Sequence, residues 1–274
     1  MSLVKRAVGV GYQSGALVPI ATDLQVIVEA GLRFPVRVLG HMDKKLADPT
    51  TTSGSTNPFL PHDPNLFVAD VSQTHRCLLN KYPIIEGHLL VVTRSFEGQE
   101  TVLNKSDFRA AWRCLSEVDG VVFYNSGTVA GASQKHKHVQ LIPHPPEPEA
   151  TSLPLKKLFG KGLPFKASHV VYTRPQVAFD GTFSDGLQAR YMEMLQALGL
   201  VEPGGSHPKP YNLLMTREFL MVVPRRNECV EGMSINAMGF MGSIFVRDHA
   251  QLERLRTYGI VNALQHAAGK GESL

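Results

Sequence analysis

The sequence contains few cysteines and no long apolar run. Only three of its 274 residues are cysteines (Cys77, Cys114 and Cys229), and no two of them are close in the chain. They cannot form a local disulfide framework, a Cys-x-x-Cys redox pair or a zinc site, which favours the reducing cytoplasm. A run of about 18 apolar residues, the length that crosses a bilayer, is missing, and glycines interrupt the amino terminus before a signal-peptide core forms.

A large excess of one charge sign is also missing. The 28 Lys and Arg residues and 24 Asp and Glu residues give a net charge of +4. The basic residues are scattered, so no nucleic-acid-binding tail is expected, although a mild positive bias suits a site for a small polyanion. With 43% hydrophobic residues the chain can bury a full-sized core. We expect one compact catalytic domain over residues 1–274, with the main motif in residues 1–150 and the rest of the site in residues 151–274.

Apolar periodicity predicts an α+β chain with a mostly antiparallel sheet. The Thr-, Ser- and Pro-rich stretch 48–64 is expected to be a long surface loop, and the Pro-rich stretch 143–154 a crossing within one domain. The expected helices are 17–34, Ser106 to the Gly120 stop, 185–200 and 248–266. The expected strands are 35–39, 66–72, 88–93, 120–124, 136–142, 168–172, 211–216 and 219–224, the last two as a hairpin.

The most informative segment is Tyr124–Ile142, YNSGTVAGASQKHKHVQLI. Its first half holds Gly127 and Gly131 among small polar residues, which lets backbone amides surround an anion. This glycine pattern alone is more typical of an ordinary hairpin loop than of an anion site. Lys135 is not preceded by glycine, so the pattern of a P-loop ATPase is not met.

The second half of the segment has a stronger pattern. On a strand, His136, His138 and Gln140 share one face, whereas Lys137 and Val139 point the other way. A neutral imidazole attacks phosphorus without first losing a proton, so His138 is the expected nucleophile. Gln140 can donate to a phosphate oxygen but cannot act as a general acid, and His136 is suited to orienting the nucleophile or bonding a neighbouring carbonyl.

Two other interpretations of the histidine pair stay open. A His-x-His strand can also supply two ligands to zinc, iron or copper, with His88, His144 or a carboxylate completing the site. No second motif with ligand spacing is visible, and we expect no metal site in the protein. The pair can also be purely structural.

Four separated motifs in the chain resemble one family. They are LLNKYP at 78–83, GASQKHKHVQ at 131–140, YNLLMT at 211–216 and INAMGFMGSIFVR at 235–247. Together they are similar to diadenosine tetraphosphate phosphorylases (ATP adenylyltransferases), in the transferase branch of the histidine-triad superfamily where glutamine replaces the third histidine. The resemblance implies a histidine-triad-like α+β fold, an antiparallel sheet with packed helices.

The resemblance also implies a reaction and a set of binding residues. A dinucleoside tetraphosphate would react with phosphate to give ADP and ATP through an adenylyl group on His138. Other implied substrate-binding residues are Lys45, Asn80, Lys81, Asn125, Gly131, Ala132, Ser133, Gln134, Asn236, Ala237, Met238, Ser243 and Arg247. The stretch around Met238 can equally be a loop that merely packs, and Lys44 is the alternative to Lys45. Arg247 stands where fungal members have lysine, which keeps the positive charge but changes its shape.

The expected partners are small molecules: dinucleoside polyphosphate, ATP, ADP and phosphate. No bound cofactor is expected, although Mg²⁺ can accompany the polyphosphate. Nucleic-acid and membrane partners are not expected, and the protein is expected to be a cytoplasmic monomer or homodimer. Rival functions are a sugar-1-phosphate nucleotidyl transferase of the same superfamily and a non-catalytic nucleotide sensor. The sugar-1-phosphate branch often has a Cys-x-x-Cys zinc site and Pro between its two histidines, where this chain has Lys137.

Overall fold

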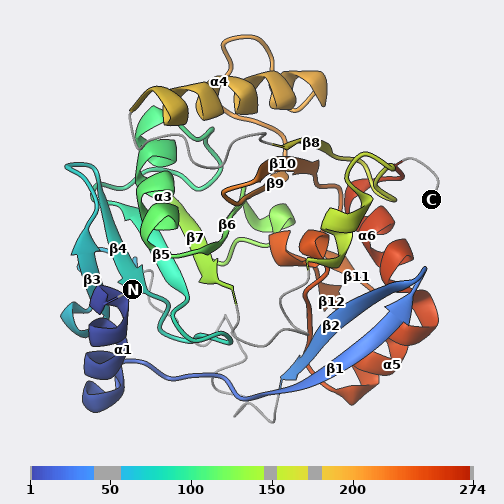
Figure 1. Ribbon diagram of the computed structural model, residues 1–274, viewed down its shortest axis with the longest axis horizontal. Coiled ribbons are helices and arrows are strands. Elements are labelled where there is room, and N and C mark those ends of the chain that lie inside the picture. Colours follow the sequence, from blue (N-terminus) through green and yellow to red (C-terminus); the bar gives the residue numbers. More distant parts are fainter. Residues whose placement is uncertain (1, 40–56, 145–152, 172–180, 272–274) are drawn as a thin grey trace.

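An antiparallel eight-stranded sheet forms the centre of the molecule (Figure 1). The computed structural model describes residues 2–39, 57–144, 153–171 and 181–271. The strand order is β3-β4-β5-β7-β6-β9-β10-β8, so the sheet takes strands from both halves of the chain. Its strands are β3 (Phe67–Asp70), β4 (His75–Leu79), β5 (Leu89–Thr93), β6 (Gly120–Asn125), β7 (His138–Pro143), β8 (Ser168–Val171), β9 (Tyr211–Met215) and β10 (Phe219–Pro224).

Different elements cover the two faces of this sheet. Successive residues of a strand point to opposite faces, so each strand contributes side chains to both cores. Helices α1 (Ser2–Ser14), α3 (Lys105–Glu117) and α4 (Gly181–Ala197) pack on one face, where Val122 and Tyr124 join their core. On the other face, Phe123 joins a core that includes a second sheet, two helices and a short 3-10 helix. These elements are β1 (Thr22–Glu29), β2 (Leu32–Leu39), β13 (Ile244–Val246), α5 (His249–Tyr258), α6 (Ile260–Ala268) and η4 (Ala237–Met241).

Short elements complete the chain between these layers. They are η1 (Pro64–Leu66), η2 (Thr128–Ala130), η3 (Pro154–Leu158), β11 (Cys229–Val230) and β12 (Met233–Ser234). Because η2 and η4 follow β6 and β12, they bring the glycine-rich segment and the carboxyl-terminal motif to the same side of the large sheet.

The predicted α+β class and antiparallel sheet are confirmed. The strands expected near 88–93, 120–124, 168–172 and 211–224 lie within one or two residues of β5, β6, β8 and the β9–β10 hairpin. The predicted helix after Ser106 is α3, although Asn104 is its N-cap: the Asn104 side chain accepts from Asp107 N–H, and the Asp107 carboxylate accepts from Asn104 N–H. The predicted loop 48–64 lies outside the described residues up to position 56.

The predicted helix 17–34 is wrong. Residues 22–29 and 32–39 form an antiparallel hairpin, β1 and β2, around Ala30 and Gly31, whose φ angles are +49° and +73°. Two consecutive positive φ angles are typical of the tight turn that joins twisted strands, and they end any helix. The β-branched run before Ala30 fits the strand better than it fits a helical spacing.

The predicted helix 248–266 is two helices. Gly259, with φ of +88°, separates α5 from α6. The Glu29 carboxylate accepts hydrogen bonds from the backbone N–H groups of Ile260 (2.6 Å) and Val261 (3.0 Å). A negative charge at a helix amino terminus is stabilising, so Glu29 fixes the new helix to the β1–β2 hairpin.

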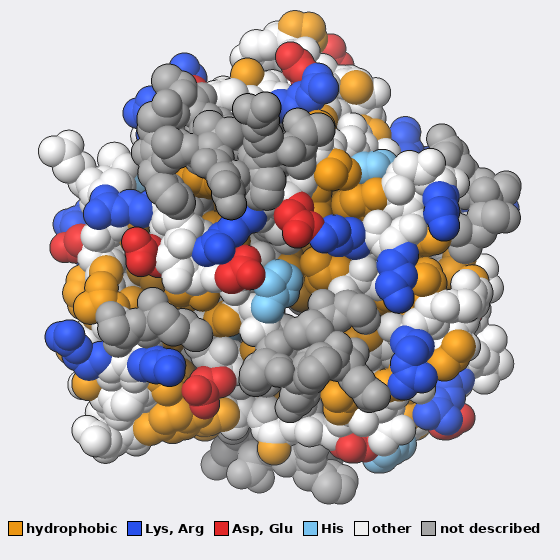
Figure 2. All heavy atoms as spheres, viewed as in Figure 1, with side chains coloured by type: hydrophobic (Ala, Val, Ile, Leu, Met, Phe, Trp, Pro, Cys, Tyr) orange, Lys and Arg blue, Asp and Glu red, His pale blue; other side chains and the backbone are white. Residues whose placement is uncertain are grey.

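Helix α1 and strand β4 were not predicted, and β7 begins two residues later than expected. In the described part of the chain, no helix combines the length and apolarity that a membrane crossing needs. Figure 2 shows basic and acidic side chains interspersed over the visible face, as their scatter in the sequence predicts.

Candidate active site

His138 is the first residue of β7, and hydrogen bonding fixes its tautomer. Its Nδ1 lies 2.8 Å from the carbonyl oxygen of His136, which can only accept, so Nδ1 carries the proton. Nε2 therefore keeps its lone pair. The ring is 4% exposed, and Phe59 packs against it with ring centroids 5.4 Å apart. Burial lowers the pKa of His138 to about 4, so the ring is neutral at pH 7.

Gln99 holds the backbone of His138. Its carboxamide accepts from His138 N–H (2.8 Å) and donates to the carbonyls of His138 (3.2 Å) and Asn125 (2.9 Å). Strands β6 and β7 pair only as far as Phe123 and Gln140, so this buried side chain replaces the missing backbone bonds. The Tyr124 hydroxyl donates to the Gln99 carbonyl and fixes the loop that carries it.

His136 is buried beside His138 and bonds a neighbouring carbonyl, as its sequence position predicts. Its Nδ1 accepts from the Asn57 amide (2.7 Å), and Nε2 donates to the carbonyl of Thr93 (2.9 Å). Its ring therefore anchors the start of β7, and its backbone carbonyl orients His138. Burial lowers the pKa of His136, which keeps this ring neutral.

A chain of hydrogen bonds orients Gln140. The Asn80 amide donates to His88 Nδ1 (3.1 Å), so His88 carries its proton on Nε2 and donates it to Gln140 Oε1 (2.9 Å). The Gln140 oxygen is thus occupied, and its amide N–H groups remain for a ligand. Burial lowers the pKa of His88 to about 4, so the donor tautomer persists at neutral pH.

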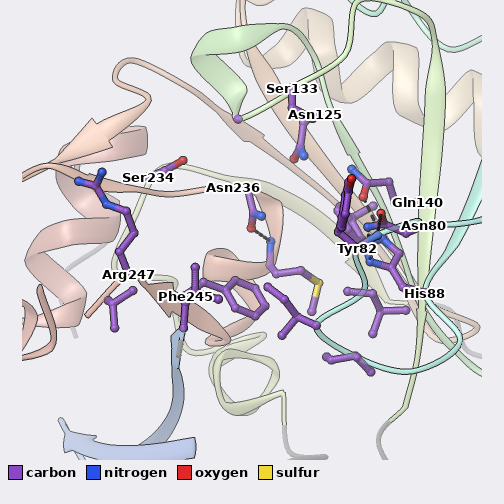
Figure 3. A pocket seen from close by; sticks show the side chains of 18 of the residues that line it. Asn80, Tyr82, His88, Asn125, Ser133, Gln140, Ser234, Asn236, Phe245 and Arg247 are labelled. Atoms are coloured by element: carbon purple, nitrogen blue, oxygen red, sulfur yellow. Dashed lines mark hydrogen bonds between the residues drawn. The ribbon is translucent and has the colours of Figure 1, made fainter. Parts of the chain in front are cut away.

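A cavity of about 460 Å³ lies next to Gln140 (Figure 3). Gln140, Asn80 and Tyr82 gather at one end and Arg247 lies at the other, with Asn125 and Asn236 between them. The remaining side is apolar. It is formed by Leu39, Ile84, Ile85, Phe123, Ile142, Met238, Phe245 and Val246.

The amides of the cavity present donors to its interior. Asn125 Oδ1 accepts from the Asn212 amide (2.8 Å) and from Ala237 N–H (3.1 Å), and Asn236 Oδ1 accepts from Met238 N–H (3.0 Å). Like Gln140, both side chains have their oxygens bonded to the protein and their N–H groups unused among the described residues. Several amide donors and one arginine suit an anionic ligand, and the apolar side suits a flat base.

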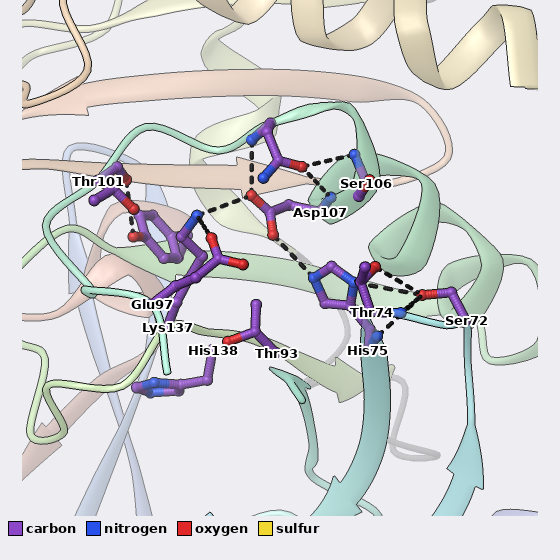
Figure 4. A network of polar contacts seen from close by, with 12 residues as sticks. Ser72, Thr74, His75, Thr93, Glu97, Thr101, Ser106, Asp107, Lys137 and His138 are labelled. Atoms are coloured by element: carbon purple, nitrogen blue, oxygen red, sulfur yellow. Dashed lines mark hydrogen bonds and ion pairs between the residues drawn. The ribbon is translucent and has the colours of Figure 1, made fainter. Parts of the chain in front are cut away.

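Lys137 points to the opposite face of β7, as the alternation predicts. There its ammonium group contacts the carboxylates of Glu97 (2.7 Å) and Asp107 (3.3 Å), and Asp107 also accepts from His75 Nε2 (2.9 Å), as Figure 4 shows. Lys137 and Asp107 are 2% and 1% exposed. The network joins the motif strand to α3 and to the segment that carries Gln99.

The structure brings half of the sixteen predicted site residues together around the cavity. They are Asn80, Asn125, Gly131, Ser133, Gln140, Asn236, Met238 and Arg247. Seven others lie outside its lining: His136, His138, Lys81, Ala132, Gln134, Ala237 and Ser243. His138 lies on β7, two residues before the cavity-lining Gln140. The backbone N–H of Ala237 donates to Asn125, and Lys81 is exposed beside Tyr82. Lys45 lies outside the described residues.

Sequence reasoning missed four residues that hold the site. From the sequence, His88 is expected only as an alternative metal ligand, and Asn212 is part of a family motif without a role of its own. Gln99 and Arg225 give no signal, because neither lies in a periodic pattern with its partners. In the part of the chain that the structure describes, no cluster of three or more His, Cys, Asp or Glu residues could hold a metal ion.

A sheet strand that presents a neutral histidine beside an amide-lined cavity is typical of nucleotidyl transferases with a histidine-triad-like fold. Comparisons narrow this class. The family model of the Ap4A phosphorylase N-terminal domain matches residues 1–161, and that of the ATP adenylyltransferase C-terminal domain matches residues 161–269. The chain therefore belongs to the family of Ap4A phosphorylases, also called ATP adenylyltransferases.

Individual relatives agree with this assignment. Diadenosine 5',5'''-P1,P4-tetraphosphate phosphorylase 2 of Saccharomyces cerevisiae is 30% identical over an alignment of 247 residues. The match covers 76% of this chain and 74% of that protein. The crystal structure of a yeast Ap4A phosphorylase in complex with Ap4A matches with a TM-score of 0.76 at 21% identity, covering 98% of this chain and 97% of that chain. Its complex with AMP has the same TM-score at 23% identity, with coverages of 98% and 96%.

The lowered pKa of His138 predicts an unusual acid limit for nucleotide transfer. The sequence predicts the neutral ring as the nucleophile, so the first chemical step should slow only as the pH falls through about 4, the value in the folded protein. Single-turnover rates between pH 4 and pH 8 measure this limit. An inflection near the ordinary histidine pKa of about 6.5 would contradict it.

The same burial makes the fold acid-sensitive. His138 and His88 both have a lowered pKa in the folded state, so their contribution to stability is fully present above the unfolded value of about 6.5. It declines as the pH falls from there through the folded value of about 4. Unfolding measured alongside the rates separates this loss of folded protein from protonation of the His138 ring.

Proposed function

We propose that this protein cleaves diadenosine tetraphosphate with phosphate, through an adenylyl group carried on His138. In the first step Nε2 of His138 attacks the α-phosphorus, an N–P bond forms, and the bridging P–O bond breaks to release ATP. In the second step a phosphate oxygen attacks the same phosphorus, the N–P bond breaks, and ADP leaves. The sum is one Ap4A and one phosphate giving one ADP and one ATP.

The tautomer of His138 is the observation that carries this proposal. Its Nδ1 proton is held by the His136 carbonyl, so Nε2 needs no base before it attacks. As positive charge develops on the ring, the hydrogen bond from Nδ1 to that carbonyl becomes stronger. Gln99 keeps the backbone of the residue in place during both steps.

The donors around the cavity support transfer of a phosphoryl group. Free N–H groups on Gln140 and Asn125 are directed where charge on the phosphoryl oxygens would be stabilised. Polyphosphate is a good leaving group, which explains why a glutamine rather than a general acid follows the histidine pair. Arg247, at the far end of the cavity, offers a positive charge to another part of the substrate.

Family membership supports the choice of substrate. The relatives are named for phosphorolysis of Ap4A, and one of their structures contains Ap4A. The cavity of about 460 Å³ has room for one nucleotide half, so the second half of the dinucleotide extends beyond it. We further propose that Mg²⁺ enters only with the polyphosphate, and that the protein works in the cytoplasm, since its three cysteines are free.

A phosphate-dependence assay tests the proposed reaction. Purified protein incubated with Ap4A should turn it over repeatedly only when phosphate is present, and the products should be ADP and ATP in equal amounts. Without phosphate, protein treated with Ap4A and quenched in alkali should carry one adenylyl group per chain, which acid releases. Breakdown of more than one Ap4A per chain without phosphate, or AMP as a product of the turnover, would overturn phosphorolysis, and phosphate-dependent turnover without an adduct would overturn the covalent step.

A further inference from the structure

Arg225 is a buried cation with no carboxylate partner among the described residues. Its side chain follows β10 and is 5% exposed, yet no ion pair to it is present there. Burial lowers the pKa of Arg225 to about 10, so the guanidinium stays charged at neutral pH. All its hydrogen bonds go to neutral groups, the carbonyls of Ala130, Asn227 and Glu228 and the Asn212 amide oxygen, and it lies over the face of Phe240. The Glu228 carboxylate acts on the charge only from beyond ion-pair distance.

Arg225 determines which way the Asn212 amide points. The guanidinium has only donors and bonds Asn212 Oδ1 at 2.8 Å, so Asn212 must direct its N–H groups away. Those N–H groups donate to Asn125 Oδ1 and to the Ala130 carbonyl, both at 2.8 Å. Asn125 therefore has its oxygen occupied and its amide nitrogen free beside the cavity, which it lines. All three side chains are at most 5% exposed.

Arg225 and Asn212 also shape the glycine-rich turn. Ala130 precedes Gly131, which lines the cavity, and its carbonyl accepts from both Arg225 and Asn212. A carbonyl held in this way is directed away from the ligand, and its negative end does not oppose an anion. The positive charge of Arg225 lies behind the turn, and no carboxylate of the described residues forms an ion pair with it.

We propose that Arg225 is a positioning residue that acts through Asn212 to aim the Asn125 amide at an anionic phosphoryl group of the substrate. The inference rests on the proposed function, because it assumes that the cavity holds a nucleotide phosphate. It assigns Arg225 and Asn212 a role in distinguishing a charged nucleotide from an uncharged nucleoside, in addition to packing.

The variant Asn212→Asp tests this role. Its carboxylate can still accept from Arg225, but it neutralises the charge and has no N–H group for Asn125. AMP and adenosine differ only by the phosphate, so their dissociation constants are measured by calorimetry on the wild-type protein and the variant. AMP binding should weaken about 10- to 100-fold, the range for a hydrogen bond to a charged group, while adenosine binding stays the same. In an Asn125→Ala background, Asn212→Asp should not further change the ratio of the AMP and adenosine dissociation constants.

Two further variants keep the test decisive. Arg225→Lys keeps the charge but cannot donate to the Ala130 carbonyl and the Asn212 amide oxygen at the same time, so it should also reduce the preference for AMP. It replaces Asn212→Asp in the test if that variant does not fold. Arg226→Met removes an exposed charge next along the chain and should leave both affinities unchanged. The proposal would be overturned if the variants weakened AMP and adenosine binding equally, so that the ratio of the two dissociation constants stayed unchanged. If the wild-type protein itself does not prefer AMP to adenosine, the proposed function fails instead.

Discussion

Replacing His138 with alanine should reduce phosphorolysis of Ap4A by at least about a thousandfold, because both ring nitrogens of His88, the neutral histidine that lines the cavity, are already hydrogen-bonded within the protein. The adenylyl adduct should disappear with the activity. The ring is 4% exposed and packs against Phe59, so the variant should also lose about 1–2 kcal/mol of unfolding free energy. Quenched-flow kinetics and urea unfolding measure the two effects separately.

The matched control is His144→Ala. His144 is a partly buried histidine just after the end of the same strand, and it does not line the cavity. Its loss should leave turnover and adduct formation within about twofold of wild type. If His138→Ala kept its activity while His136→Ala lost it, the roles of the two histidines would be exchanged.

A second variant tests the chemistry of the intermediate. His138→Gly removes the imidazole and leaves room in the site, so an adenosine 5′-phosphorimidazolide can bind with the missing ring already attached to phosphorus. Phosphate should convert this compound to ADP on the variant, which would perform only the second step. No ADP above the uncatalysed rate, with AMP binding intact, would contradict transfer from a nitrogen at this position.

The sequence predicted the strand that carries His138 and Gln140 because its information is local. Alternation alone separates His138 and Gln140 from Lys137, and β7 places them on opposite faces of the sheet. The motifs around Asn80, Asn125 and Asn236 also converge on one cavity, as the family resemblance implies. What these positions share is a short stretch in which strand or turn geometry fixes the side-chain direction.

The supporting residues could not be predicted, because their partners are distant in the chain. Gln99 bonds the backbone of a strand 39 residues further on, and Arg225 bonds a carbonyl 95 residues earlier. Neither contact leaves a periodic pattern. The error over 17–34 has another cause: both helical and alternating patterns fit its apolar residues, and the β-branched run before Ala30 and the turn at Ala30 and Gly31 favour the strands.

The variant Lys137→Met should be strongly destabilising, with a loss of about 3–5 kcal/mol of unfolding free energy. Lys137 is 2% exposed and gives Asp107 its cationic partner, so methionine fills the space but leaves a buried carboxylate poorly compensated. Loss of the bond to Glu97 should also loosen the segment that carries Gln99 and lower turnover. Urea unfolding of this variant and of Lys135→Met, an exposed lysine two residues earlier, measures the difference.

Adding Asp107→Asn to Lys137→Met decides whether the charge is the cause. The amide occupies the same space, can still accept from His75 or from the N–H of Asn104, and is uncharged, so the double variant should regain part of the lost stability. If packing or the capping box mattered more than the charge, the stability losses of Lys137→Met and Asp107→Asn would add in the double variant. Recovery would show that the lysine between the two histidines balances a buried carboxylate behind β7, on the face of the sheet opposite to His138.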